Sequence, residues 1–479
     1  MTFLSLPETA FVEPSGQNRD AIQALFNQVG QQLLDYLTQA AHQAPLPPAS
    51  TDWMGKIPES SRDAPSLLQD LDQVLAQSMN PGHPGYMGHM DPLPTTISMV
   101  GDWVAAAINN NMLSVEMSPA LSRLEPLLMT EIAQDLFGLG PQAGGMLIGG
   151  GSLANLQALV LARNVKLGCL RAGLAAVQQP PVIFASERAH TSIQKAAMVM
   201  GLGLQGVVLV PTTAAGQLDI SQLEAKIRAA KDAGYAPFAV VATAGTTVTG
   251  NIDPLPQVAA LARQYDLWFH VDAAYGGAIV FSAAHRHRLA GIELADSVTF
   301  NPQKWLYVAK TCASVLFRDM DLLQHHFRIP APYMNQAYDW VNLGEISVQG
   351  TRHADVLKLW LTLQHLGKAG CGKLIETSYT LTDHFVAEIR RRPYLRLATA
   401  PDMNVVCFRG CPDDLPPERW DAWNAGLQNR LLEQQHCFLS LPLLDRARWL
   451  KAVILNPFTT PDQISALFQD MDRYHALTP

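Results

Sequence analysis

The sequence predicts an α/β protein built around a largely parallel sheet, and three observations lead to this class. Short apolar runs alternate with helical segments through the middle of the chain, which indicates βαβ units. The runs are apolar throughout, as expected of parallel strands that are buried on both faces. Glycine-rich or polar turns follow several of them, where the ligand crevices of open α/β sheets form. The runs read PVIFAS, GVVLVP, FAVVATAG, LWFHVDAAY, SVTFN and ASVLF.

Helices are predicted on both sides of this region. The stretch NRDAIQALFNQVGQQLLDYLTQAA carries apolar residues at helical spacing, and the proline-rich LPPASTD ends it. Two more helices are expected over residues 121–137 and 153–168, on either side of the turn GGMLIGGGS. Residues 319–350 are rich in Pro, Asn and Gln and predict a long loop, which a helix over 354–367 follows.

The last hundred or so residues predict a second, smaller α/β unit. Its strands are expected at LRLA, NVVCFRG, CFLSLPL and KAVILN, with helices between and after them. The chain therefore divides into a helical N-terminal segment (1–85), a large cofactor-binding domain (86–369) and a small C-terminal α/β domain (370–479).

Composition excludes several functional classes. The chain of 479 residues is 48% hydrophobic and 16% charged, which is typical of an ordinary globular protein and not of a disordered or fibrous one. Its net charge is −8 and it has no long basic run, so nucleic acids and anionic membranes are not expected partners.

The cysteines, the N-terminal sequence and the uncharged stretches indicate the cellular compartment in which the protein is expected. Six cysteines are scattered without a CxxC pair, so neither a disulfide framework nor a metal site is expected, and reduced thiols in a cytoplasm fit better. The N-terminus lacks the basic region of a signal peptide. The uncharged stretches 144–162 and 196–218 are interrupted by Gly, Gln or Pro, as in core strands and turns rather than membrane spans.

One lysine stands in an unusual setting. Lys304, in SVTFNPQKWLY, follows an apolar strand and precedes aromatic residues, where an unpaired ammonium is costly to bury. Asp272 ends the preceding apolar strand, in HVDAAYGG, and a buried carboxylate there needs a partner. Either residue alone has an ordinary structural explanation.

Three further motifs follow strands. GGGSLAN is a glycine-rich turn into a helix, whose amides and Ser152 hydroxyl could hold a phosphate; it is neither GxGxxG nor a Walker A loop. TAGTTVTGNIDP has several hydroxyls and an acid in a turn. His190, in ERAHTSIQKAA, adds an imidazole.

Together these groups indicate one ligand that has a phosphate, a ring with a basic nitrogen, and an aldehyde. Pyridoxal 5'-phosphate has all three. Lys304 would form the Schiff base, because a desolvated lysine loses its proton readily enough to be a nucleophile. Asp272 would keep the pyridine nitrogen protonated, so that the ring can act as an electron sink.

The motifs, taken in order, resemble the group II pyridoxal-phosphate-dependent amino-acid decarboxylases, relatives of the aromatic-amino-acid, glutamate and cysteine-sulfinate enzymes. The resemblance implies a fold-type-I enzyme with a mostly parallel seven-stranded sheet, and a homodimer with active sites at the interface. The matching segments are HPGYMGHMDP, SPALSRLEP, GGGSLAN, ERAHTSIQKA, TAGTTVTGNIDP, HVDAAYGG, NPQKW and TRHADVLKLW.

The resemblance also implies roles for individual residues. Lys304 and Asp272 keep the roles given above, His190 stacks on the cofactor ring and Ala273 packs on its opposite face. Tyr333, in FRIPAPYM, matches the mobile-loop tyrosine that returns a proton to the substrate carbon after carbon dioxide leaves. The remaining cofactor contacts are Gly151, Ser152 and Asn301 to the phosphate, and Thr247 and Asp253 in the pocket.

This chain departs from the family at one position next to the lysine. Many members have a histidine there, whereas this chain has Gln303. Glutamine can form hydrogen bonds but cannot titrate or carry protons, so the pH profile and the fidelity of reprotonation are open.

The substrate pocket is expected in the segments GHMDP and NNNMLSVEM, with Arg352 near the helix start that follows TRH. His89, Asp91, Asn111 and Leu113 are its candidate residues, and the Asn-rich stretch is more like the glutamate-type branch. Asp91 disfavours an acidic substrate, because two carboxylates at ~4 Å repel by about 4 kcal/mol at an effective dielectric near 20. A cationic His89 would reverse this. Diaminobutyrate, then aspartate or glutamate, then hydroxylated aromatics are expected.

Other functions are compatible with parts of the pattern. An aminotransferase shares Lys304 and Asp272, but the His190 motif and the Tyr333 loop favour decarboxylation. An aldehyde synthase is nearly identical, although such variants often lose the loop tyrosine. A silent interaction protein does not need Lys304, and a nicotinamide-dependent dehydrogenase lacks its GxGxxG here.

Overall fold

The computed structural model describes residues 6–52, 54–332, 334 and 340–477. Within them the large domain contains a seven-stranded sheet in the order β1-β7-β6-β5-β4-β2-β3. The strands β3, β2, β4, β5 and β6 pair in parallel, whereas β7 runs antiparallel to both β6 and β1. Their bounds are β1 Gly144–Ile148, β2 Pro181–Ser186, β3 Val207–Val210, β4 Ala236–Thr243, β5 Trp268–Asp272, β6 Ser297–Phe300 and β7 Ala313–Phe317. The predicted class is confirmed.

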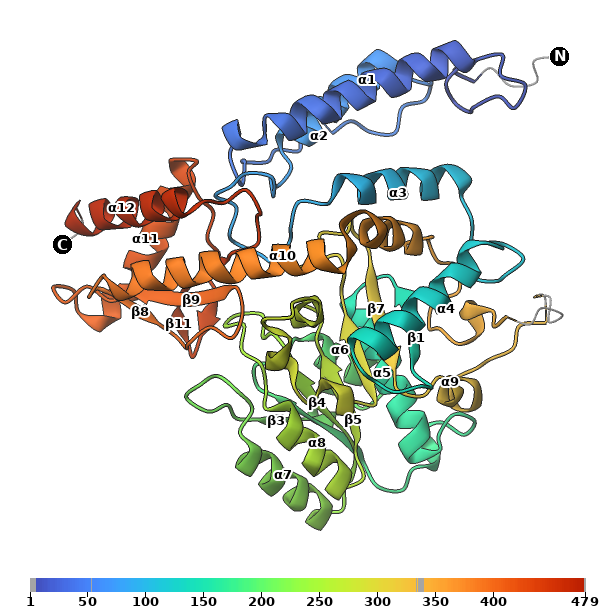
Figure 1. Ribbon diagram of the computed structural model, residues 1–479, viewed down its shortest axis with the longest axis vertical. Helices are drawn as coiled ribbons and strands as arrows, with labels where there is room; N and C mark the ends of the chain where they lie inside the picture. The colour runs from blue at the N-terminus through green and yellow to red at the C-terminus, as the bar shows by residue number, and fades with distance from the viewer. Residues whose placement is uncertain (1–5, 53, 333, 335–339, 478–479) are drawn as a thin grey trace.

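Both faces of this sheet are covered, which explains why its strands are apolar throughout. In β2, Val182 and Phe184 pack into one hydrophobic cluster, while Ile183 and Ala185 pack into another on the opposite face. The helices α5 (Gly151–Leu167) and α6 (Ser192–Val199) contribute to the second cluster, and α7 (Ile220–Asp232) and α8 (Leu255–Gln264) to the first. Figure 1 shows the sheet enclosed between these helices.

Local sequence signals set the ends of these helices. Asp219 caps α7 by accepting hydrogen bonds from the amides of Ser221 and Gln222. Gly168 ends α5 in the left-handed conformation, with φ 63°. The helix predicted over 121–137 is α4 (Leu121–Glu131), continued by a π-helical turn at Ile132–Leu136.

The small domain holds a three-stranded antiparallel sheet in the order β12-β9-β8. Its strands are β8 Leu395–Leu397, β9 Val405–Gly410 and β12 Leu450–Val453, packed with α11 (Trp420–Glu433) and α12 (Pro461–Leu477). The strand expected at CFLSLPL is wrong as a regular strand. It forms isolated bridges from Phe438 to Tyr86 and from Ser440 to Lys451, followed by the short hairpin β10 (Leu443–Leu444) and β11 (Ala447–Arg448).

One long helical element joins the two domains. The element α10 (Val356–Arg390) is interrupted at Gly367, whose φ of 64° and ψ of 173° are not helical. Gly367 is where the sequence predicts the helix to end. The predicted boundary between residues 369 and 370 lies just beyond this break, and remains a prediction.

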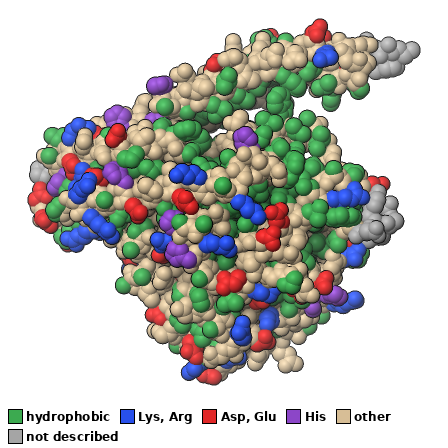
Figure 2. All heavy atoms as spheres, viewed as in Figure 1, with side chains coloured by type: hydrophobic (Ala, Val, Ile, Leu, Met, Phe, Trp, Pro, Cys, Tyr) green, Lys and Arg blue, Asp and Glu red, His purple; other side chains and the backbone are tan. Residues whose placement is uncertain are grey.

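The N-terminal segment forms an arm. Figure 1 shows α1 (Arg19–Thr38) and α2 (Ala64–Ala76) side by side above α3 (Thr96–Ile108), set off from the sheet. Between them, the described residues of α1 and α2 bury only Ile22. Figure 2 shows hydrophobic side chains along the arm and α3. None of the helices in the described ranges is long and apolar enough to cross a membrane.

Candidate active site

Asp272 and Lys304 lie at the same edge of the large sheet. Asp272 ends β5, and Lys304 lies in the turn after the neighbouring parallel strand β6, whose Thr299 is opposite Asp272. Burial lowers the pKa of the Lys304 amine, while the carboxylates of Asp272 and Asp91 act in the opposite direction. The site therefore makes a lysine that loses its proton more easily than an exposed one, close to an acid.

The turn that carries Lys304 is fixed by its neighbour. The Gln303 side-chain oxygen accepts a hydrogen bond of 2.5 Å from the backbone amide of Cys312. The backbone amide of Gln303 donates to the Cys312 carbonyl at 3.1 Å. Gln303 thus ties this turn to the segment that enters β7. At the position where many relatives have histidine, this chain has a side chain engaged with its own backbone.

The Asp272 carboxylate is held at both oxygens. Its Oδ2 accepts from Asn155 Nδ2 at 2.9 Å, and its Oδ1 accepts from the amide of Ala274 at 3.1 Å. The side chain is 5% exposed. These two hydrogen bonds fix the carboxylate at the end of β5.

His190 follows β2 and leaves its ring exposed. Its Nδ1 accepts from the amide of Ser192 at 3.2 Å and lies 2.8 Å from the Ser192 hydroxyl. Burial lowers the pKa of His190, and Lys304 adds to this effect while Asp272 opposes it. A neutral His190 therefore carries its proton on Nε2.

The start of α5 forms the predicted phosphate cradle. Gly150 precedes it with φ 144°, and among the described residues no side chain caps this end. A Cβ on Gly151 would lie 2.7 Å from Asn301 Nδ2, so only glycine lets these two segments approach. The buried Asn301 Oδ1 has no hydrogen-bond partner among the described residues, and Ser152 is exposed in the first turn.

Two predicted cofactor contacts are placed elsewhere. Ala273 is 0% exposed and packs into the hydrophobic core, because side chains alternate at the strand end; the neighbouring Ala274 is the partly exposed one. Asp253 is 2% exposed, and its carboxylate accepts from the amides of Thr243 and Leu218. Asp253 therefore holds backbone segments together instead of facing the pocket.

A cavity of about 560 Å³ opens beside His190. Thr247 is exposed and lines this cavity together with His190, whereas Asp272 and Lys304 are not among its lining residues. The predicted contact of Thr247 with the cofactor stays a prediction. The backbone carbonyl of Thr247 also lies 3.4 Å from Lys451 Nζ.

Lys451 is a buried charged residue close enough to Lys304 and Asp91 to feel their charges, and the sequence reasoning missed it. It lies on β12 of the small domain and is 5% exposed. Burial, with a smaller contribution from the nearby Lys304, lowers its pKa to about 8, while Asp91 acts in the opposite direction. The sequence did contain a signal for Lys451, because in KAVILN a lysine stands beside an apolar run, as Lys304 does in SVTFNPQKWLY.

The two candidate substrate residues of GHMDP lie near these lysines. Asp91 forms an ion pair with Lys310, another residue that the sequence reasoning did not single out. The His89 ring packs edge-on against Phe438 at 5.4 Å. Burial and the nearby Lys451 lower the pKa of His89, so this histidine is not the cation that would compensate Asp91. Lys310 compensates it instead.

The other three substrate candidates lie together in a different setting. The side-chain oxygen Oδ1 of Asn111 accepts from the backbone amides of Leu113 and Arg352, and Leu113 packs closely on Gly344. The Arg352 guanidinium is buried and donates to Glu125 Oε1 at 2.8 Å and to the Leu147 carbonyl at 2.7 Å. This differs from the expectation that Arg352 binds the substrate. Tyr333, the predicted proton donor, lies outside the described residues.

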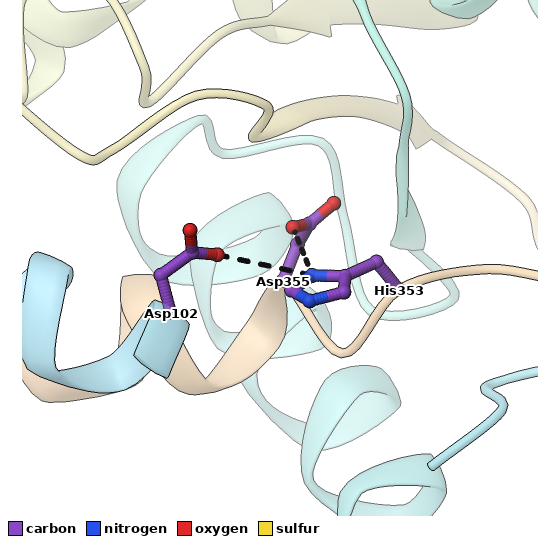
Figure 3. A group of neighbouring side chains, drawn as sticks. All are labelled: Asp102, His353 and Asp355. Carbon is purple, nitrogen blue, oxygen red and sulfur yellow. Dashed lines mark hydrogen bonds and ion pairs between the residues drawn. The ribbon is translucent and has the colours of Figure 1, made fainter. Parts of the chain in front are cut away.

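A separate group of acids and a histidine has the spacing of a metal site. Asp102, His353 and Asp355 lie with their ligand atoms within 4.8 Å of one another (Figure 3). The buried Lys358 ammonium lies 2.7 Å from Asp355 Oδ1 and 3.0 Å from Asp102 Oδ1. This ammonium supplies the positive charge that the carboxylates need, so the group joins α3 to α10.

Comparison with known families decides the class. A family model described as the pyridoxal-dependent decarboxylase conserved domain matches residues 51–410. The chain belongs to this family. It is an amino-acid decarboxylase that depends on pyridoxal phosphate.

Solved structures agree with this assignment. Mouse CSAD has a TM-score of 0.89 and 29% identity, with 95% of this decarboxylase and 98% of the mouse chain covered. Oryza sativa TDC with PLP and tryptamine has a TM-score of 0.90 at 22% identity, covering 97% and 99% of the two chains. A decarboxylase domain from Vibrio parahaemolyticus has a TM-score of 0.86 at 24% identity, covering 98% of each chain. The last two comparisons show the shared fold.

The residues of this decarboxylase fit the cofactor. The start of α5 has no side-chain cap and the nearby Asn301 oxygen has no partner among the described residues, so polar groups are available there for a phosphate. The carboxylate at the end of β5 suits a cationic ring nitrogen, and the lysine after β6 suits an aldehyde. The carboxylate and the lysine lie at the same edge of the sheet, at the ends of the neighbouring strands β5 and β6.

Proposed function

We propose that this enzyme removes the α-carboxylate of a polar L-amino acid, with aspartate or glutamate ahead of diaminobutyrate and hydroxylated aromatics. The observation that carries the decarboxylase mechanism is that the partly desolvated Lys304 and the carboxylate of Asp272 lie at the same edge of the sheet. The substrate order rests on the charges around them.

In this mechanism Lys304 attaches the cofactor, and its lowered pKa favours the neutral amine that does so. Asp272 holds the ring nitrogen, and His190 packs its exposed ring against the cofactor face. Bound pyridoxal phosphate supplies an electron sink for the bond that breaks when carbon dioxide leaves. Tyr333 returns a proton to the α-carbon, on a segment long enough to exclude water.

Lys451 is proposed to bind the side-chain carboxylate of an acidic substrate. It is a buried cation near Lys304, and among the described residues its hydrogen-bond partner is the Thr247 carbonyl, which leaves ammonium protons for an anion. A charge-assisted hydrogen bond to the carboxylate contributes about 1.5–3 kcal/mol. The Nη atoms of Arg352 are bonded to Glu125 and to backbone carbonyls, and only its buried Nε has no partner among the described residues.

The same charges change the expected side-chain preference. Asp91 repels an acidic substrate only when its charge is uncompensated, and Lys310 pairs with it. With that pair neutral overall, Lys451 leaves the pocket with excess positive charge. An acidic side chain is then favoured over the second amine of diaminobutyrate.

A homodimer is proposed from the N-terminal arm. Helices that bury almost nothing are marginal in water, and α1 and α2 bury only Ile22 among their described residues. Exposed apolar side chains continue onto α3, where Trp103 is 59% exposed and packs edge-on against Phe26. A second copy would cover this face and add residues to the pocket. The other exposed members are Leu33, Leu34, Leu37, Leu67, Val74, Val100, Val104 and Ile108.

The test is carbon dioxide release from a panel containing aspartate, glutamate, diaminobutyrate, tyrosine, phenylalanine and tryptophan. Wild type should prefer an acidic substrate, and Lys304→Ala should release none. Borohydride reduction should fix the cofactor to the peptide containing Lys304. Fixation at Lys310 or Lys451 would contradict the attachment site, and a preference for phenylalanine or tryptophan would contradict the pocket assignment.

The same assay separates the alternatives. An aldehyde synthase consumes oxygen and gives aldehyde and ammonia, and Rhodiola rosea 4-hydroxyphenylacetaldehyde synthase shares this fold with a TM-score of 0.86 at 20% identity. An aminotransferase gives a keto acid without carbon dioxide. An amine formed in a one-to-one ratio with carbon dioxide supports simple decarboxylation.

A further inference from the structure

A chain of buried hydrogen bonds ends on Asp272. Trp268 Nε1 donates to Ser297 Oγ at 2.8 Å, and Ser297 Oγ lies 2.8 Å from His270 Nδ1. His270 Nε2 lies 3.0 Å from Asn155 Oδ1, and Asn155 Nδ2 donates to Asp272 Oδ2 at 2.9 Å. Each of these side chains is buried.

The donor and acceptor of each hydrogen bond in this row can be assigned by starting from Trp268. The Trp268 indole can only donate, so the Ser297 hydroxyl proton is free to go to His270 Nδ1. Burial lowers the pKa of His270 to about 4, so its ring is neutral and its single proton is on Nε2. That proton meets the amide oxygen of Asn155, which turns the amide nitrogen toward the carboxylate.

Asn155 is also bonded to the segment that carries His190. The same Asn155 Nδ2 donates to Ser192 Oγ at 2.8 Å, and Ser192 is the residue that holds His190 Nδ1. One amide group therefore touches the carboxylate expected at the ring nitrogen and the serine that orients the ring-stacking histidine.

We propose that Asn155 is a positioning residue that holds Asp272 for the cofactor nitrogen, with His270 fixing the orientation of its amide. The proposal rests on the role given to Asp272 in the proposed function. Without Asn155, the Asp272 carboxylate keeps only the Ala274 amide on Oδ1 among the described residues, and can rotate away from the nitrogen.

The probe is the affinity of the apoenzyme for two aldehydes. Pyridoxal phosphate has the ring nitrogen, and 1-deazapyridoxal phosphate has CH in its place. Asn155→Ala should weaken pyridoxal phosphate binding about tenfold, which is ~1.4 kcal/mol. It should change binding of the deaza analogue less than about twofold, because that analogue makes no bond to Asp272.

The control is Asn164→Ala. Asn164 is a buried asparagine on the same helix, α5, but its amide donates to the carbonyl of His326. This variant should bind both aldehydes alike. An equal loss of both in Asn155→Ala would mean a purely structural role, and an unchanged affinity for pyridoxal phosphate would also overturn the proposal. If wild type binds both aldehydes equally, the proposed role of Asp272 itself fails.

Asn155→Asp gives a second, volume-conserving test. The new carboxylate can still accept the hydrogen bond from His270, but an unprotonated oxygen now lies next to Asp272 where the amide donor was. Two adjacent carboxylates tend to retain a shared proton. Lowering the pH restores a donor, so the affinity of this variant for pyridoxal phosphate should rise relative to wild type between pH 8 and pH 6. A constant ratio across this range would contradict the proposed direction of the bond.

Discussion

Arg352 Nη1 lies 2.8 Å from Glu125 Oε1, and both side chains are buried where α4, β1 and the start of α10 meet. Glu125 Oε1 also accepts from the amide of Leu147, whose carbonyl accepts from Arg352. The pair therefore joins a helix, a strand and a loop that are distant in sequence. Removing one partner would leave an uncompensated buried charge.

Arg352→Met should accordingly lower the free energy of unfolding by about 3–5 kcal/mol, the usual result of breaking a buried ion pair from one side. Urea unfolding of the apoenzyme measures it. Arg391→Met is the matched control, because the Arg391 side chain is 67% exposed in its pair with Glu388 and should cost about 1 kcal/mol or less. A normal stability with a greatly raised KM would instead return Arg352 to the substrate site.

The proposed carboxylate contact of Lys451 predicts a pH dependence. The Lys451 pKa is lowered to about 8, so its ammonium is present below this pH and is lost as the pH rises through it. KM for the preferred substrate should therefore rise above pH 8, as measured by steady-state kinetics from pH 6.5 to 9.5.

Two variants separate this effect from titration of Lys304. Lys451→Arg should move the rise in KM to higher pH, since a guanidinium stays charged. Lys451→Met should raise KM about tenfold or more even at pH 7, consistent with a lost charge-assisted hydrogen bond of ~1.5–3 kcal/mol. An unshifted profile in Lys451→Arg would assign the titration to another group.

The apolar face of the arm predicts that the dimer is sensitive to charge at its centre. Trp103→Lys should shift the enzyme toward monomer at micromolar concentration, measured by analytical ultracentrifugation, because it introduces an ammonium into the covered face. Leu204→Lys, at another exposed apolar side chain on the large domain, is the control. Equal behaviour of the two variants would contradict the proposed interface.

The loop tyrosine predicts a change of product. Tyr333→Phe should slow amine formation and increase aldehyde and ammonia, because the carbon left by carbon dioxide then waits longer for a proton. Oxygen consumption and product analysis measure this, with Tyr338→Phe as the control. The opposite result in the two variants would identify Tyr338 as the donor.

Much of the fold could be predicted because its signals are local. PVIFAS coincides with β2 in full, because a run of consecutive apolar residues identifies a buried strand. Gly367 coincides with the break in α10, because a glycine adopts a positive φ easily. The Lys304 and Asp272 turns were found for the same reason. CFLSLPL was wrong as a regular strand because it pairs only through isolated bridges at Phe438 and Ser440. Its apolar side chains Cys437 and Leu439 pack in the small-domain core.

The rest of the site depends on contacts between distant segments. Lys451 reaches Thr247 across 204 residues, and Arg352 reaches Glu125 across 227, so neither the role of the first nor the burial of the second can be inferred from neighbours. Ala273 was placed one residue away from the partly exposed alanine, because the strand-end alternation depends on where β5 stops.

The hydrogen bonds that run from Trp268 to Asp272 do not conduct protons. A proton can pass along such a row only if each member can both receive and release one, and the amide of Asn155 cannot do so near neutral pH. His270, the one titratable group between the ends, has a pKa of about 4 and stays neutral there. Asp272 is thus held in position by this row, which gives its carboxylate no path for protons to or from Trp268. Through this row the buried residues set the position of the Asp272 carboxylate without exchanging protons with it.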